Sequence, residues 1–189
     1  MENLLSIFIG IGLSAASGFR IFIPFLVLGI TSTMGFVDLD DDFKWISTAP
    51  AIIVFAALTI AEIIGYFNPW IDNMLDTVAT PLSIISGTIL SLSVITGFDP
   101  LIQWSIAIII GGGIAADFQF LSVKARSVSS VFSGGNGNPV ISGLELVFSV
   151  ILSILSIYLP VITFVIVIIL MISLFIILRN AKARLNEKF

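Results

Sequence analysis

Long apolar runs alternate with short polar segments along the whole chain. The runs cover residues 4–30, 49–66, 79–95, 101–121, 140–158 and 161–178. Most of them hold close to the roughly 20 residues that an α-helix needs to cross the hydrocarbon core of a bilayer. The pattern predicts an all-α polytopic membrane protein with about six transmembrane helices. Residues 1–189 are expected to form a single transmembrane domain.

The composition narrows the classes of function. Hydrophobic residues make up 58% of the chain and charged residues 11%, whereas a soluble domain has about 25% charged residues. The chain contains no Cys and no His, which excludes disulfides, thiolate or histidine metal sites and the common catalytic relays. We therefore expect no cofactor and no enzyme activity. The formal net charge of −4 disfavours nucleic acid as a partner.

The charges outside the runs predict an orientation in the membrane. The first polar segment carries Asp38, Asp40, Asp41 and Asp42 together with Lys44. Basic residues gather after the fourth run and in the C-terminal tail, as Lys124, Arg126, Arg179, Lys182, Arg184 and Lys188. Basic segments stay in the cytoplasm, and six crossings place both termini on one side. The sequence thus predicts a multi-pass protein of the inner (plasma) membrane with both termini cytoplasmic.

Glycine interrupts the first and the fourth runs. Because glycine lowers helix stability by about 1 kcal/mol relative to alanine, its clusters mark a helix break or a close helix contact. The predicted breaks are Gly10, Gly12, Gly18, Gly111, Gly112 and Gly113. Residues 6–20 align with residues 105–119 without a gap, which favours an inverted repeat of three plus three spans. The alternative is that apolar sequence aligns with itself easily and the glycines only allow close packing.

Ionisable residues inside the runs are the strongest functional signal, because a charged side chain at the bilayer centre costs at least about 2.5 kcal/mol. Asp72 and Asp76 lie nearby at i, i+4 spacing on one helix face. The candidate substrate- or ion-binding residues are Arg20, Glu62, Asp72, Asp76, Asp117 and Glu145. On the six-span map, the acids form a layer near the cytoplasmic side. Crowded carboxylates share protons or bind hard cations such as Na⁺, Ca²⁺, Mg²⁺ or Mn²⁺.

Two interpretations of these charges stay open. If the first run breaks and turns inward, Arg20 neutralises an acid or binds an anionic substrate group. If that run is straight, Arg20 extends its guanidinium outward to lipid phosphates. The acids likewise either meet one another or face water separately at the headgroups.

Together these features predict a small ion- or proton-coupled transporter or channel-like carrier with an acidic intramembrane site. The alternative is a non-transporting membrane module that handles lipid or assists assembly. The expected partners are the lipid bilayer, a small ion or solute and, for so small a chain, further copies in a homo-oligomer. Acids and Arg20 converging on an enclosed wet cavity favour transport, whereas a lateral apolar groove favours lipid handling.

Two segments also carry a family resemblance. Residues 14–25, Ser-Ala-Ala-Ser-Gly-Phe-Arg-Ile-Phe-Ile-Pro-Phe, form the first, and residues 61–78, which begin Ala-Glu-Ile-Ile-Gly-Tyr-Phe-Asn-Pro-Trp, form the second. Together they resemble a group of small bacterial integral membrane proteins known as a domain of unknown function. The resemblance implies an inner-membrane protein with Gly18, Arg20 and Glu62 in the family pattern. It implies no particular activity.

Overall fold

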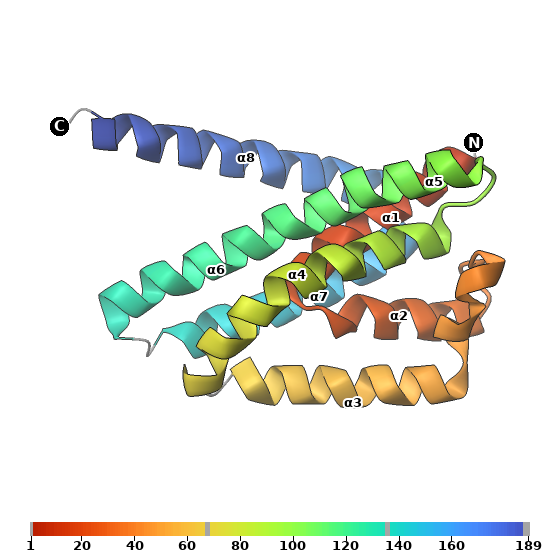
Figure 1. Ribbon diagram of the computed structural model, residues 1–189, viewed down its shortest axis with the longest axis horizontal. Coiled ribbons are helices and arrows are strands. Elements are labelled where there is room, and N and C mark those ends of the chain that lie inside the picture. The colour runs from red at the N-terminus through yellow and green to blue at the C-terminus, as the bar shows by residue number, and fades with distance from the viewer. Residues whose placement is uncertain (1, 67–68, 135–136, 187–189) are drawn as a thin grey trace.

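All the regular elements in the described part of the chain are helices, as the sequence predicts. The computed structural model describes residues 2–66, 69–134 and 137–186. In chain order the elements are α1 (Glu2–Phe19), α2 (Phe22–Thr33), η1 (Asp41–Ser47), α3 (Ala49–Tyr66), α4 (Pro69–Val94), α5 (Pro100–Ile106), η2 (Ala107–Gly112), α6 (Gly113–Ser133), α7 (Asn138–Tyr158) and α8 (Pro160–Asn186). Figure 1 shows them as a single elongated bundle.

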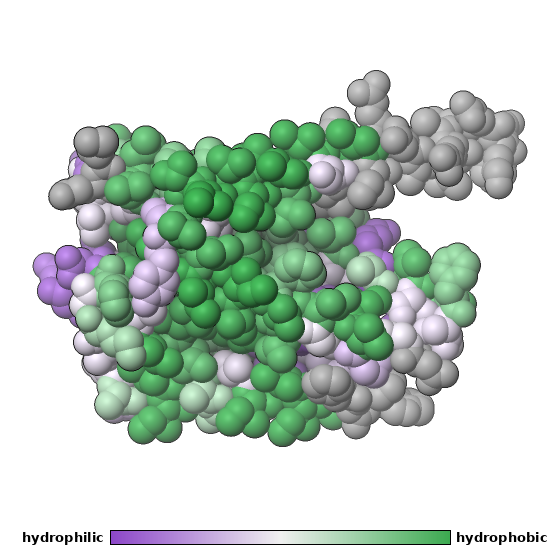
Figure 2. All heavy atoms as spheres, turned by 180° about the vertical axis from the view of Figure 1, so that it is seen from behind, coloured by the Kyte–Doolittle hydropathy of each residue, from purple (hydrophilic) through white to green (hydrophobic). Residues whose placement is uncertain are grey.

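The surface of the bundle matches a lipid environment. Among the described residues, four helices are long and apolar enough to cross a membrane: Ala49–Tyr66, Met74–Val94, Pro100–Ser133 and Asn138–Tyr158. Asn3–Phe19, Phe22–Thr33 and Pro160–Ser173 are shorter apolar helices. Hydrophobic residues cover most of the face in Figure 2, and the most hydrophilic ones lie toward its two ends. So large an exposed apolar surface indicates a membrane-embedded protein.

The first apolar run folds as a hairpin of two short helices, so the prediction of one crossing over residues 4–30 is wrong. Asn3 at the start of α1 donates a hydrogen bond to the Gly97 carbonyl at 3.4 Å. The backbone N–H of Asp40, after α2, donates to the Ser93 carbonyl at 2.9 Å. Both open ends of the hairpin therefore lie beside the same turn, and its tip points into the bundle (Figure 1).

Pro24 explains why α1 stops where it does. The last α-helical bond of α1 runs from the Arg20 N–H to the Ala16 carbonyl at 3.1 Å. If the helix continued, the ring of Pro24 would clash with the Arg20 carbonyl and leave it without a donor. In the first turn of a new helix a proline is tolerated, because the missing N–H has no intrahelical partner there.

The hairpin changes the count of crossings. After it, α3, α4, the α5–η2–α6 rod, α7 and α8 run back and forth along the bundle (Figure 1). Figure 1 places the start of α1 and the end of α8 at opposite ends of the bundle. The prediction that both termini share one side is therefore wrong. The physical reason is that two short helices bent into a hairpin contain as many apolar residues as one long span.

The glycines of α1 allow close packing and do not break the helix. A Cβ atom at Gly12 would lie 2.8 Å from the Thr163 side chain, and one at Gly18 would lie 2.6 Å from the Ala115 carbonyl oxygen. At Gly10 a Cβ atom would lie 3.2 Å from Ser91 Oγ. Helix α1 runs unbroken through all three positions, so the predicted breaks there are wrong. It lies at the centre of the bundle against α4, α6, α7 and α8.

The fourth run contains a π-helical segment but keeps its direction. Its residues Ala107–Gly112 form the π-helical element η2, and the rod then continues as α6. At the crossing with α4, a Cβ atom on Gly111 would lie 2.7 Å from the Gly87 carbonyl oxygen. One on Gly113 would meet nothing within 4 Å among the described atoms. Because the first run reverses direction and the fourth does not, the two runs fold differently and the structure gives no support to the inverted repeat.

Candidate functional site

A network of buried charges lies beside the tip of the α1–α2 hairpin. Arg20 Nη2 lies 3.4 Å from Glu145 Oε2 on α7 and donates to the Ser142 carbonyl at 2.9 Å. Arg126 on α6 places Nη1 2.8 Å from Glu145 Oε2 and Nη2 2.5 Å from Asp76 Oδ1 on α4. Glu145 therefore bridges the two arginines. We call Arg20, Asp76, Arg126 and Glu145 the charge network.

The two arginines and Glu145 of the network are buried, so their pairing is required for stability. The side chains of Arg20 and Glu145 are 2% and 5% exposed. Ser122 adds a hydrogen bond from its hydroxyl to Glu145 Oε1. A charge in a medium of low dielectric constant is tolerated only when it is paired and hydrogen-bonded. The two cations and two anions of the network cancel, which is what burial at this depth requires.

Tyr66, the last residue of α3, joins both arginines. The Arg20 guanidinium carbon lies 4.0 Å from the centre of the Tyr66 ring, and that of Arg126 lies 4.4 Å from it. Tyr66 is itself buried. A cation near the face of an aromatic ring is attracted by the ring quadrupole. The shared ring and the shared carboxylate of Glu145 together hold two like charges near each other.

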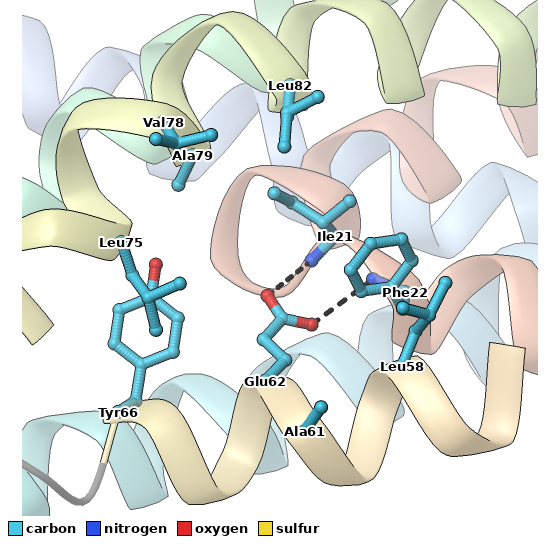
Figure 3. Close-up of a pocket in the computed structure, with 10 residues that line it drawn as sticks. All are labelled: Ile21, Phe22, Leu58, Ala61, Glu62, Tyr66, Leu75, Val78, Ala79 and Leu82. Carbon is cyan, nitrogen blue, oxygen red and sulfur yellow. Dashed lines mark hydrogen bonds between the residues drawn. The ribbon is translucent and has the colours of Figure 1, made fainter. Parts of the chain in front are cut away.

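Glu62 binds the hairpin tip directly. Its Oε1 accepts a hydrogen bond from the Ile21 N–H at 2.9 Å, and its Oε2 accepts one from the Phe22 N–H at 3.3 Å (Figure 3). These donors begin α2, where N–H groups have no intrahelical acceptor and carry a partial positive charge. Ile21 at the N-cap position provides no side-chain acceptor. The carboxylate on α3 therefore caps a helix from a distant part of the sequence.

A cavity opens beside Glu62, between the hairpin tip, α3 and α4. Its volume is about 190 Å³. The residues that line it are Ile21, Phe22, Leu58, Ala61, Glu62, Tyr66, Leu75, Val78, Ala79 and Leu82 (Figure 3). Leu58, Val78 and Leu82 are exposed on the outside of their helices. The cavity is therefore apolar apart from Glu62 and the Tyr66 hydroxyl, and it opens sideways toward the membrane.

The structure unites some of the predicted site residues and separates others. Arg20, Asp76 and Glu145 belong to the charge network, and Glu62 lies next to it at the hairpin tip. Asp72 belongs to α4, but its side chain lies outside the described residues.

Asp117 does not join the acids, and its assignment to the acidic layer is wrong. Its side chain is exposed and lines a separate groove of about 390 Å³ with apolar residues of α1, η2, α6 and α8. Successive residues of a helix are about 100° apart. Asp117 and Arg126, nine residues apart, therefore lie on opposite faces of α6.

Several site residues are absent from the sequence-based prediction. Arg126 counts there as a cytoplasmic loop charge, and Tyr66 has no assigned role. The helical spacing of polar residues would have revealed the buried polar faces of α6 and α7, including Arg126. On α7 the buried polar residues recur every three or four positions, as Asn138, Ser142, Glu145, Ser149, Ser153 and Ser156. On α6 they are Gln119, Ser122 and Arg126. In apolar helices this spacing predicts a buried polar face.

The carboxylates of the charge network contact arginines. Within the described ranges, no group of three or more Asp or Glu residues is placed to hold a metal ion. Arginines instead lie against Asp76 and Glu145. Arg20 Nε and Nη1 are buried donors without a hydrogen-bond partner among the described residues. Arg20 therefore has donors left for an anionic group or water.

Comparison with known proteins gives a family without an activity. The family model described as a domain of unknown function (DUF4126) matches residues 7–180. This confirms the resemblance to an uncharacterised family. No curated protein and no solved structure matches the chain.

Proposed function

The chain belongs to this family of unknown function, and we propose that it is a small ion- or proton-coupled carrier of the inner membrane. The observation that carries the proposal is the convergence of Arg20, Asp76, Arg126 and Glu145 at the hairpin tip, with Glu62 beside them. Charges that served only the membrane surface would point separately toward headgroups. These charges contact one another inside the bundle.

The depth of the site supports the proposal. Helix α2 has 12 residues, so it is about 18 Å long at 1.5 Å per residue. Helix α1, which ends at the same tip, has 18 residues and is about 27 Å long, so the tip lies inside a hydrocarbon core of about 30 Å, past its middle. Interrupted helices whose ends meet near the bilayer midplane form the binding sites of many transporters. Ionisable groups at that depth are functional candidates for the same reason.

The proposed orientation places the start of α1 outside and the end of α8 in the cytoplasm. The Asp-rich segment between α2 and α3 lies at the end of the bundle where α1 begins (Figure 1). The basic residues of α6 and of the C-terminal tail belong to segments that end at the opposite side. The positive-inside rule assigns that side to the cytoplasm.

A proton at Glu145 is the simplest coupling step. When Glu145 is ionised, it holds Arg20 and Arg126 together. Protonation removes that anion, and the two like charges then repel each other at low dielectric constant. Because Arg20 lies at the hairpin tip, the repulsion shifts the tip relative to α6 and α7. The bound proton is thereby linked to two arrangements of the bundle, as a coupled carrier requires.

A second candidate, lipid handling, has its own supporting observation. Both the cavity at Glu62 and the groove at Asp117 have mainly apolar walls, and their rims include exposed side chains of membrane-facing helices. A lipid tail could enter either of them sideways. This candidate predicts movement of lipid between leaflets and no flux of ions.

Reconstitution into liposomes separates the two candidates. Proton flux is followed with an internal pH dye over a panel of small cations and anions, and lipid movement with a fluorescent phospholipid. We expect solute-dependent proton flux that Glu145→Gln abolishes and that Asp117→Asn, an exposed carboxylate away from the network, leaves unchanged. Lipid movement without proton flux would favour lipid handling. Equal proton flux in the parent and in correctly folded Glu145→Gln would refute coupling through the network.

A chain of this size encloses a pathway most readily with further copies, so the carrier is proposed to work as a homo-oligomer. Light scattering of the purified protein, corrected for bound detergent, measures this. A monomer that retains flux would contradict it.

A further inference from the structure

Glu62 is the one carboxylate among the residues that line the apolar cavity beside the hairpin tip. We propose that the cavity between the hairpin tip, α3 and α4 binds a small amphipathic monocation, an organic ammonium group with an alkyl or aryl part. The positive charge pairs with Glu62, and the apolar part lies against α4. That this cation is a transported substrate rests on the proposed carrier function. Its binding can be measured without transport.

Charge complementarity selects a cation. Glu62 forms no ion pair with a described Lys or Arg side chain, and its carboxylate contacts the two backbone N–H groups of the hairpin tip instead. A cation in the cavity supplies a positive side-chain partner. Each oxygen of Glu62 accepts one hydrogen bond from the described residues, whereas a carboxylate offers about four acceptor positions. The remaining positions are free to meet an ammonium group.

The walls of the cavity exclude bare metal ions and inorganic anions. A hard metal cation needs several oxygen ligands, and Glu62 is the only carboxylate that lines the described cavity. An anion would be repelled by that carboxylate. Figure 3 shows the side chains of Val78, Ala79 and Leu82 across the cavity from Glu62. Carbon atoms of this kind suit a ligand whose charge is small and whose remaining surface is apolar.

The volume of the cavity and its opening limit the size and the polarity of the ligand. The volume of about 190 Å³ is slightly larger than a cavity of about 150 Å³ that holds benzene. One aromatic ring or a short alkyl chain fits, but a whole phospholipid does not. The rim residues Leu58, Val78 and Leu82 are exposed on membrane-facing helices. A ligand that partitions into the bilayer can therefore enter from the side.

The test measures binding of benzyltrimethylammonium to the purified full chain in lipid nanodiscs, by ligand-observed NMR. Neopentylbenzene has the same shape without the charge, and phenylacetate has the opposite charge. We expect saturable binding of the cation, about tenfold tighter than that of neopentylbenzene, and no binding of phenylacetate. Glu62→Gln is expected to weaken cation binding by about tenfold, since the charge is lost while the size is kept.

Two further variants keep the test decisive. Ala79→Leu fills the cavity without changing Glu62, so it is expected to abolish cation binding even if Glu62→Gln proves unstable. Asp117→Asn removes a carboxylate from the other groove and is expected to leave binding unchanged. Equal affinity for the cation and neopentylbenzene, or unchanged binding in folded Ala79→Leu, would overturn the inference. Cation binding without any flux would instead refute only the carrier function, and flux without cation binding would refute only this inference.

Discussion

Two ion pairs in this protein have the same length and opposite surroundings. Arg126 Nη2 lies 2.5 Å from Asp76 Oδ1, with side chains 3% and 16% exposed. Lys44 Nζ lies 2.5 Å from Asp41 Oδ1, with side chains 65% and 90% exposed. Water surrounds and screens the second pair, whereas the first pair is inside the bundle, where an unpaired charge is costly. The distance between the charged atoms therefore does not show which pair contributes more to stability.

The outer pair is one element of the short helix η1. Asp40 caps this helix by accepting a hydrogen bond from the Asp42 N–H at 3.2 Å. Lys44 lowers the pKa of Asp41 through a hydrogen bond and its positive charge. The inner pair joins Asp76 on α4 to Arg126 on α6, and these two residues are 50 positions apart in the sequence. The Lys44–Asp41 pair is a local contact within η1, whereas the Arg126–Asp76 pair joins two helices that are distant in the sequence.

The largest expected effect comes from removing Arg126. Arg126→Ala leaves Asp76 and Glu145 buried without this partner, so we expect the free energy of unfolding to fall by about 3–5 kcal/mol. Unfolding by increasing denaturant in mixed micelles measures it. Arg126→Lys is the matched control, because it keeps the charge and loses only the forked geometry. A loss below about 1 kcal/mol for Arg126→Ala would mean that the buried pair behaves like a surface pair.

Removing Glu62 is expected to have the second largest effect. Glu62→Ala leaves the Ile21 and Phe22 N–H groups at the hairpin tip without their acceptor, which costs about 1–3 kcal/mol. Hydrogen exchange should accelerate at these two amides and much less at the amides in the middle of α7. Unchanged protection at the tip would contradict the capping role of Glu62. The conservative variant Glu62→Gln keeps an acceptor oxygen and should lie between the parent and Glu62→Ala.

Replacing Tyr66 tests the contact that the two arginines share. Tyr66→Leu keeps the residue apolar and removes the ring, so we expect a loss of about 1–2 kcal/mol in the free energy of unfolding. Tyr66→Phe keeps the ring and serves as the control, with a smaller change expected. If both variants lose stability equally, the hydroxyl and not the ring carries the effect of Tyr66.

The smallest effect is expected at the exposed pair. Lys44→Ala should leave the unfolding midpoint at pH 7 unchanged, because both partners face water. It should raise the pKa of Asp41 toward its ordinary value, since Lys44 is the cause of the lowering. Any stability from this pair exists above the ordinary pKa of Asp41 and is lost as the pH falls through the lowered value. NMR titration of the Asp41 carboxyl carbon measures the shift, and high salt should reproduce it in the parent.

These comparisons also show which parts of the site were predictable. Arg20, Glu62 and Glu145 stand out in the sequence because each interrupts an apolar run, and the structure brings all three to the hairpin tip. Arg126 stands beyond the end of its run and looks like a loop residue. Helix α6 extends further than the run does, to Ser133, and so takes Arg126 into the bundle. The apolar length of a run gives only a lower limit for its helix.

The sequence by itself determined the class of the protein, since apolar length, the cost of a buried charge and the absence of Cys and His are properties of single segments or of composition. Only the tertiary structure decided that the first run folds back, that the start of α1 and the end of α8 lie at opposite ends of the bundle and that Asp117 lies apart from the other acids. The reason is that apolar sequence is equally satisfied by a straight span and by a hairpin packed in the bundle. Pro24 ends α1 locally, but the folded-back arrangement is held by Glu62 and by the polar face of α7, both distant in the sequence from the turn at Arg20.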